Sequence, residues 1–131
     1  MAKMIHSMIR VSNLDRSLKF YAQALQLNVQ QQYDFDSFSL VYLANEESSF
    51  ELELTYNVDR STPYSHGSGY GHIAVSVDDI HATHSTLHAA GLMPGEVKVF
   101  HHQGDVLAKF FFITDPDGYQ IELIERAGRY Q

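Results

Sequence analysis

Two histidines and two glutamates occupy equivalent positions of an internal repeat. His6 and His72 each open a similar β-branched run, at an offset of 72 − 6 = 66 residues. Glu53 and Glu122 each begin a Glu-Leu pair near the end of a copy, at an offset of 122 − 53 = 69 residues. Imidazoles and carboxylates together suit Zn²⁺, Ni²⁺, Co²⁺ or non-haem Fe²⁺. The repeat therefore predicts one divalent metal site formed by these four side chains.

Other residues compete for these roles. Glu51 shares a strand face with Glu53, but in the repeat Glu51 aligns with Gln120 and Glu53 aligns with Glu122, which favours Glu53. Several further histidines have no acidic partner, and we expect them outside the site: the helical pair His84 and His88, and the connector residues His101 and His102. His66 lies in a loop, where a substrate role stays open.

Each copy reads as a strand, a helix and three more strands. The first copy predicts strands and a helix at 4–11, from 14, 28–33, 38–43 and 50–56. The second copy predicts them at 71–77, 79–90, 96–100, 106–114 and 119–125. The Ser-, Pro- and Gly-rich run 58–69 separates the copies. We therefore expect an α+β fold of two βαβββ modules, 1–63 and 64–131, with curved mixed sheets in a single domain.

Alternation along the strands places the candidate site on one sheet face. His6 shares a face with Arg10, and Glu53 shares a face with Asn57. One helix covers only one face of each sheet, so the other face is expected to pair with a second module or a second chain and form a cleft. The four candidate ligands are expected to converge there.

Local signals mark the helix ends and one turn. Asn13 is a candidate N-cap, Gly91 is a candidate C-terminal cap, and Asp-Pro-Asp-Gly at 115–118 predicts a hairpin turn. The first helix carries apolar residues at i, i+4, i+7 and i+11, which predicts its packed stripe: Leu14, Leu18, Tyr21 and Leu25.

Composition narrows the class of protein. The chain has 131 residues, a formal net charge of −7 and no cysteine. This charge disfavours nucleic acid and anionic membranes as partners, and the lack of cysteine excludes disulfides and thiolate ligands. No signal peptide and no membrane span are expected, which predicts a cytoplasmic protein.

Motifs along nearly the whole chain are similar to those of one family. They are the strand 6–11, Phe-Tyr at 20–21, Glu-Leu-Thr-Tyr-Asn at 53–57, Tyr-Gly-His at 70–72, and Asp-Pro-Asp-Gly-Tyr at 115–119 with the later Glu-Leu. On these residues the chain resembles bacterial glyoxalase I (lactoylglutathione lyase), of the vicinal oxygen chelate superfamily. Asp-Pro-Asp-Gly marks the superfamily, whereas Glu-Leu-Thr-Tyr-Asn with Tyr-Gly-His is more specific.

The resemblance implies a homodimer with active sites between chains. His6 and Glu53 would come from one chain, and His72 and Glu122 from the other. The substrate would be the hemithioacetal of methylglyoxal and glutathione, and the product S-lactoylglutathione. The metal would be Ni²⁺ or Co²⁺ in preference to Zn²⁺, acting as a Lewis acid on the substrate's adjacent oxygens.

The resemblance also implies roles for single residues. Arg10 and Asn57 match the glutathione-binding arginine and asparagine of the family. Glu122 matches the principal proton-transfer base, and Glu53 is its rival because the repeat makes the two carboxylates equivalent.

Two segments depart from the family pattern. Val58-Asp59 follows Asn57 where Trp-Gly is usual, and 103–106 replaces a Gly-rich or basic loop, with Lys109 displaced. The alternatives within the superfamily are an acyl-CoA epimerase, which is expected to carry Gln in place of Glu53, an extradiol dioxygenase with three protein ligands, and a metal-free sequestering protein.

Overall fold

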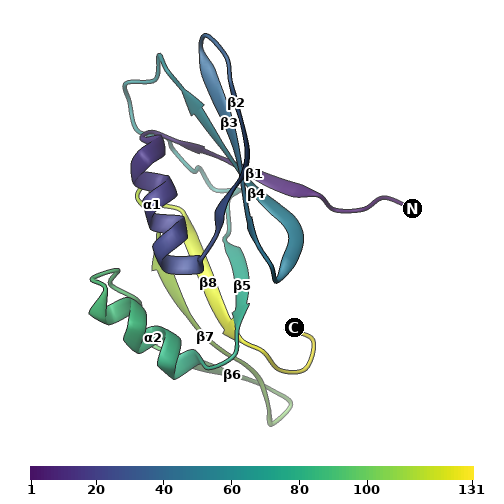
Figure 1. The fold of residues 1–131 in the computed structure, drawn as a ribbon. Coiled ribbons are helices and arrows are strands. Elements are labelled where there is room, and N and C mark those ends of the chain that lie inside the picture. Colours follow the sequence, from purple (N-terminus) through teal and green to yellow (C-terminus); the bar gives the residue numbers. More distant parts are fainter. The chain divides into compact units, whose positions relative to one another are not determined.

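A four-stranded sheet with one helix occurs twice in the computed structural model, which describes residues 1–131 (Figure 1). The first unit, 1–65, contains β1 (His6–Val11), α1 (Leu14–Leu25), β2 (Asn28–Asp34), β3 (Phe38–Asn45) and β4 (Ser48–Asn57). The second unit, 66–131, contains β5 (Ile73–Val77), α2 (Ile80–Ala89), β6 (Lys98–His102), β7 (Asp105–Thr114) and β8 (Gln120–Glu125). The predicted α+β fold with two βαβββ modules is confirmed.

The strand order brings the first and last strands of each unit together. The orders are β1-β4-β3-β2 and β5-β8-β7-β6. β1 runs parallel to β4 and β5 runs parallel to β8, whereas the other neighbours are antiparallel. The chain can make these parallel neighbours because the intervening helix and strands provide a long crossover. Each candidate histidine therefore lies beside the strand that carries its candidate glutamate.

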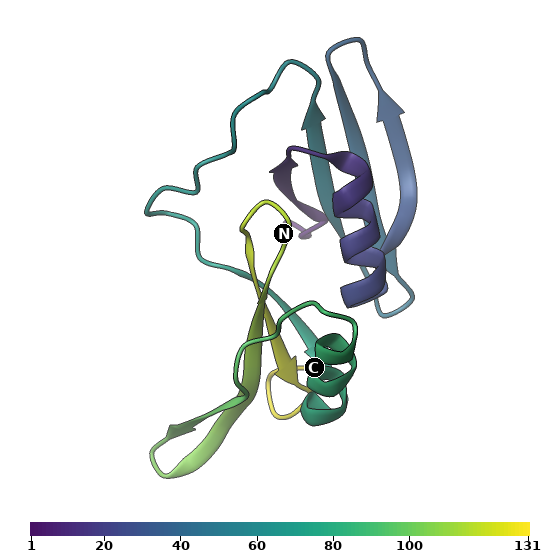
Figure 2. The same cartoon turned by 90° about the vertical axis from the view of Figure 1, so that its left-hand side faces the viewer.

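Each helix lies along one face of its own sheet (Figures 1 and 2). The fully buried strand residues alternate along the strands, as expected for one covered face. In the first unit they are Val11, Val41, Leu43 and Leu54, and in the second Phe111, Ile113, Ile121 and Leu123. Neither helix is long and apolar enough to cross a membrane.

The buried face of α1 differs from the predicted stripe. Its buried residues are Ser17, Phe20, Tyr21 and Ala24, so of the predicted stripe only Tyr21 is buried and its three leucines are half-buried. Two aromatic rings bury more apolar area than leucines, and the small Ser17 and Ala24 beside them let this face approach the sheet. The predicted N-cap is confirmed, since Asn13 Oδ1 accepts from Arg16 N at 3.0 Å.

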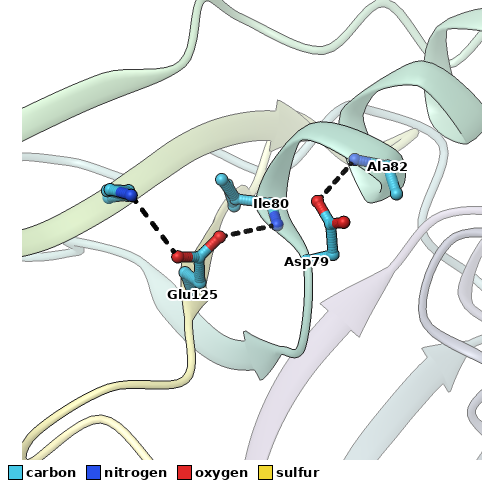
Figure 3. A network of polar contacts seen from close by, with 5 residues as sticks. Asp79, Ile80, Ala82 and Glu125 are labelled. Atoms are coloured by element: carbon cyan, nitrogen blue, oxygen red, sulfur yellow. Dashed lines mark hydrogen bonds and ion pairs between the residues drawn. The ribbon is translucent and has the colours of Figure 1, made fainter.

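Two carboxylates hold the start of α2 (Figure 3). Asp79 Oδ1 accepts from Ala82 N at 2.9 Å, and Glu125 Oε2 on β8 accepts from Ile80 N at 3.1 Å. Glu125 Oε1 also lies 3.7 Å from Lys109 Nζ. Backbone N–H groups at a helix start have no partner within the helix, so Glu125 satisfies one of them and ties α2 to the sheet. Gly91 follows the helix with φ +76°, as predicted.

The hairpin between β6 and β7 corrects one prediction. His101 and His102 lie in β6 and not in a connector. The turn itself is Gln103-Gly104, and both residues have positive φ, 52° and 87°. A two-residue turn with positive φ at both positions matches the twist of the flanking strands, so β6 continues up to the turn.

Candidate functional site

The first His–Glu pair bridges β1 and β4. His6 Nε2 lies 3.0 Å from Glu53 Oε2. The Cα of His6 is in register with that of Glu51, so Glu53 lies two residues further along β4. Glu51 makes no ion pair with His6, and Glu53 is the carboxylate that meets the imidazole. The Glu53 side chain is 9% exposed although it lies on the sheet face opposite the apolar core.

The second pair repeats this arrangement between β8 and the residue before β5. His72 Nε2 lies 2.7 Å from Glu122 Oε2. Glu122 is in register with Ala74, two residues after His72. The sequence predicted His72 within a strand, but β5 begins at Ile73. His72 therefore needs support from outside the ladder of backbone hydrogen bonds.

An aromatic cluster gives that support. Tyr70 Oη donates to the Gln120 carbonyl at 3.1 Å, and the His66 ring stacks on Tyr119 with centroids 4.3 Å apart. Burial, with the neighbouring Asp115 carboxylate, raises the pKa of Tyr70. The segment before His72 is thus fixed to the start of β8. His66, for which the sequence left a substrate role open, has a packing role here.

The Asp-Pro-Asp-Gly turn fixes the other end of the same cluster. Asp115 Oδ1 accepts from Asp117 N at 2.9 Å and from Tyr119 N at 2.8 Å, as in a turn stabilised by an aspartate side chain. Gly118 has φ +89°, and a Cβ there would lie 3.2 Å from His66 Cε1. The predicted hairpin turn is confirmed, and it sets the register of β8 and so the position of Glu122.

The histidines of α2 do not join these pairs. His84 Nε2 lies 2.9 Å from the Gly95 carbonyl, and its ring packs edge-on against Phe111. His88 lies beside His84 with ring centroids 6.4 Å apart. The structure contains no group of three or more histidines and carboxylates, so such residues meet within a unit as pairs.

Arg10 and Asn57 lie on the same strands as the first pair. Arg10 is an exposed residue of β1, with Thr55 as its Cα partner on β4. Asn57 ends β4, and its Nδ2 donates to Tyr64 Oη at 3.3 Å. Arg60 in turn lies over the Tyr64 ring at 4.3 Å. A polar ligand reaching Asn57 would meet this tyrosine as well.

Tyr42 is a residue of the site that sequence reasoning missed. It lies on β3 opposite Glu53, and its hydroxyl is hydrogen-bonded to the Glu53 carboxylate. Partial burial and the Glu53 charge raise the pKa of Tyr42. The repeat could have revealed it, because Tyr42 and Phe112 hold equivalent positions opposite the two glutamates.

The two pairs fit a divalent metal. Nitrogen and oxygen ligands lie about 2.1 Å from an ion such as Zn²⁺, so two such atoms at a right angle are about 3.0 Å apart. The observed separations are 3.0 Å for His6–Glu53 and 2.7 Å for His72–Glu122. Each unit thus presents one imidazole nitrogen and one carboxylate oxygen as adjacent potential ligands.

Comparisons with known proteins point to one family. The family model described as Glyoxalase/Bleomycin resistance protein/Dioxygenase superfamily matches residues 3–123. The chain is 42% identical over 130 residues to the lactoylglutathione lyase of Haemophilus influenzae, covering 94% of this chain and 92% of that protein. It is 37% identical over 134 residues to a probable lactoylglutathione lyase of Synechocystis, covering 96% and 97%. A trypanothione-dependent glyoxalase I of Leishmania major has a TM-score of 0.74 at 38% identity, covering 95% and 87%.

Proposed function

The chain belongs to the Glyoxalase/Bleomycin resistance protein/Dioxygenase superfamily, and we propose that it is a glyoxalase I, which isomerises the methylglyoxal–glutathione hemithioacetal to S-lactoylglutathione. The predicted lactoylglutathione lyase activity is confirmed at the level of relatives, which carry this name at 42% and 37% identity over most of both chains. The structural observation that carries the proposal is the repeated His–Glu pair, His6 with Glu53 and His72 with Glu122.

These four side chains are proposed to hold one divalent ion in each active site. In a homodimer, His6 and Glu53 of one chain would meet His72 and Glu122 of its partner, as the sequence resemblance implies. Two carboxylates balance the charge of the ion, and six-coordination leaves two positions for substrate or water. Ni²⁺ or Co²⁺ is favoured over Zn²⁺, because Zn²⁺ in proteins is most often four-coordinate. When bound, the ion supplies Lewis-acid stabilisation of charge on the substrate's two adjacent oxygens.

The protein's own groups move the proton and hold the thiol part of the substrate. Glu122 accepts the proton from C1 of the hemithioacetal and returns it to the adjacent C2, acting first as base and then as acid. A proton also moves from the C1 hydroxyl to the C2 oxygen, so no oxidant or reductant is needed. Arg10 and Asn57 are proposed to bind the glutathione part, with Arg10 making charge-assisted hydrogen bonds to a carboxylate.

The test of the function is an assay with methylglyoxal and glutathione. Protein stripped of metal and then loaded with Ni²⁺, Co²⁺ or Zn²⁺ should form S-lactoylglutathione, fastest with Ni²⁺ or Co²⁺. Stripped protein should be inactive. Higher activity with Zn²⁺ than with Ni²⁺ would overturn the metal preference, and no activity with any ion would overturn the function. The acyl-CoA epimerase alternative is disfavoured because position 53 holds Glu, where Gln is expected.

Arg10→Ala tests the substrate-binding role. Arg10 should contact a part of the substrate remote from the reacting carbons, equally in the ground and transition states, so KM should rise with little change in kcat. Loss of a hydrogen bond to a charged group predicts an increase of about tenfold. An unchanged KM would show that Arg10 is not a substrate contact.

The remaining expectations concern the state of the protein. Analytical ultracentrifugation should show a homodimer, because neither unit alone presents four ligands. A cytoplasmic location stays a prediction from the sequence.

A further inference from the structure

The two His–Glu pairs have matching aromatic neighbours. Tyr42 on β3 is in register with Glu53, and Phe112 on β7 is in register with Glu122. Each ring also meets the histidine of its pair edge-on: the centroids are 5.7 Å apart for His6–Tyr42 and 5.4 Å apart for His72–Phe112. The two aromatic rings therefore occupy corresponding places, and each restricts its imidazole in the same way.

The hydroxyl group of Tyr42 is the difference between these places. It is hydrogen-bonded to the Glu53 carboxylate. Phenylalanine has no polar atom, so Phe112 offers Glu122 no such bond, and within its unit the Glu122 side chain pairs with His72. The Glu122 side chain is also the more exposed, at 15% against 9% for Glu53.

The rings behind these two residues follow the same division. Tyr42 packs edge-on against Tyr33 of β2, with centroids 6.4 Å apart. Phe112 instead joins an apolar cluster, edge-on to Phe110, which in turn meets Phe100 of β6. The first unit thus surrounds its glutamate with a hydrogen-bond donor, and the second unit surrounds its glutamate with hydrocarbon.

We propose that Tyr42 is a positioning residue that fixes Glu53 as the stationary metal-holding carboxylate and leaves Glu122, opposite Phe112, as the carboxylate that moves to the substrate. This assignment rests on the proposed function. A carboxylate bonded to both a hydroxyl and an imidazole must break one more interaction to leave its place, and charge-assisted hydrogen bonds are the stronger kind. Partners that orient metal ligands commonly set metal affinity. The two units thereby divide holding from proton transfer.

The experiment exchanges the hydroxyl between the units. Tyr42→Phe removes one oxygen and keeps the ring, and Phe112→Tyr adds one opposite Glu122. Tyr33→Phe is the matched control, because it removes a hydroxyl from the ring that packs against Tyr42. The readouts are the Ni²⁺ dissociation constant, by competition with a chelator, and kcat at verified metal loading.

Tyr42→Phe should weaken Ni²⁺ binding about tenfold, the lower end for loss of a ligand's outer partner, while kcat at full loading changes less. Phe112→Tyr should lower kcat several-fold without weakening Ni²⁺ binding. Tyr33→Phe should change neither quantity. In the double exchange, the loss of kcat caused by Glu122→Gln should shrink and that caused by Glu53→Gln should grow.

An unchanged Ni²⁺ dissociation constant in Tyr42→Phe would overturn the proposal, as would an equal effect of Tyr33→Phe. If Phe112→Tyr unfolds, the Tyr42→Phe result still decides, since that variant only deletes an oxygen. Failure of the proposed function is separate: it would appear as an inactive wild type with every metal, while Ni²⁺ affinity still reports on Tyr42.

Discussion

In the first unit the imidazole comes from within a strand, whereas in the second it comes from the residue just before one. His6 begins β1 and is held by the pairing of β1 with β4. His72 precedes β5, and the segment before it is held by Tyr70 and His66 against the start of β8. Both routes place Nε2 within 3.0 Å of a glutamate oxygen. One repeat can thus reach one geometry with different supports.

The carboxylates differ in the opposite sense. Glu53 has a hydroxyl neighbour in Tyr42, and Glu122 has the apolar Phe112. The first unit therefore has the more tightly held carboxylate, and the second has the more elaborately supported imidazole. Duplication leaves each copy free to specialise, because a change in one copy need not be repeated in the other.

Glu122→Gln should have the largest effect and tests the carboxylates directly. The amide keeps the shape and an oxygen but cannot accept the proton, so kcat should fall by roughly 10²–10⁴-fold, the usual contribution of general acid–base catalysis. Metal content should fall less than activity. Glu53→Gln, measured at the same verified metal loading, should lower kcat less.

The outcome for these two variants can also reverse the comparison. If Glu53→Gln is inactive and Glu122→Gln is near wild type, the roles are exchanged. If both remain active, neither carboxylate is the base.

His72→Ala and His6→Ala compare the two imidazoles. Each should weaken metal binding by about 100-fold or more, because loss of a ligand exceeds loss of an outer partner. Metal analysis after gel filtration would measure this. His84→Ala is the control, since His84 contacts the Gly95 carbonyl and not a glutamate. Equal metal loss in the control, or full retention in His72→Ala, would refute the ligand assignment.

Gly118→Ala tests the support that is specific to the second unit. Gly118 has φ +89°, and its new Cβ would lie 3.2 Å from His66 Cε1. A left-handed conformation costs a residue with a Cβ about 1–2 kcal/mol, so the free energy of unfolding in urea should fall by at least this amount. Gly67→Ala is the control, with φ +61° and open space around its Cβ. Equal losses would show that the His66 contact contributes nothing.

Tyr70→Phe should have the smallest effect, and its effect should depend on pH. Loss of the bond to the Gln120 carbonyl should lower the free energy of unfolding by about 1 kcal/mol at neutral pH. The pKa of Tyr70 is raised by burial first and by Asp115 second. A raised pKa in the folded state means that the neutral form stabilises the fold below the ordinary value of about 10, and that this contribution is lost as the pH rises through the folded value.

The difference in unfolding free energy between wild type and Tyr70→Phe should therefore shrink above about pH 10. Urea unfolding at neutral and alkaline pH would measure it. A constant difference across this range would show that Tyr70 titrates normally.

The family and the order of elements followed from the sequence. The repeat, the two-residue alternation and the Asp-Pro-Asp-Gly turn are local signals, and the structure and the comparisons confirm the fold and the family that they predicted. The register of each parallel pair then brings His6 to Glu53 and His72 to Glu122, as the repeat suggested. Their roles as metal ligands stay predictions, as do the module boundary at 63/64 and the grouping into one domain.

Packing between distant segments decided the rest. Spacing placed the leucines of α1 on its packed face, but the sheet buries Ser17, Phe20, Tyr21 and Ala24. The bond from Tyr42 to Glu53 depends on the register between β3 and β4, and the stacking of His66 on Tyr119 joins residues 53 positions apart in the chain (119 − 66). A periodic pattern reports which residues share a face, because that depends on backbone geometry alone. Which of them becomes buried or bonded depends on the shape and polarity of the partner segment, which only the tertiary structure supplies.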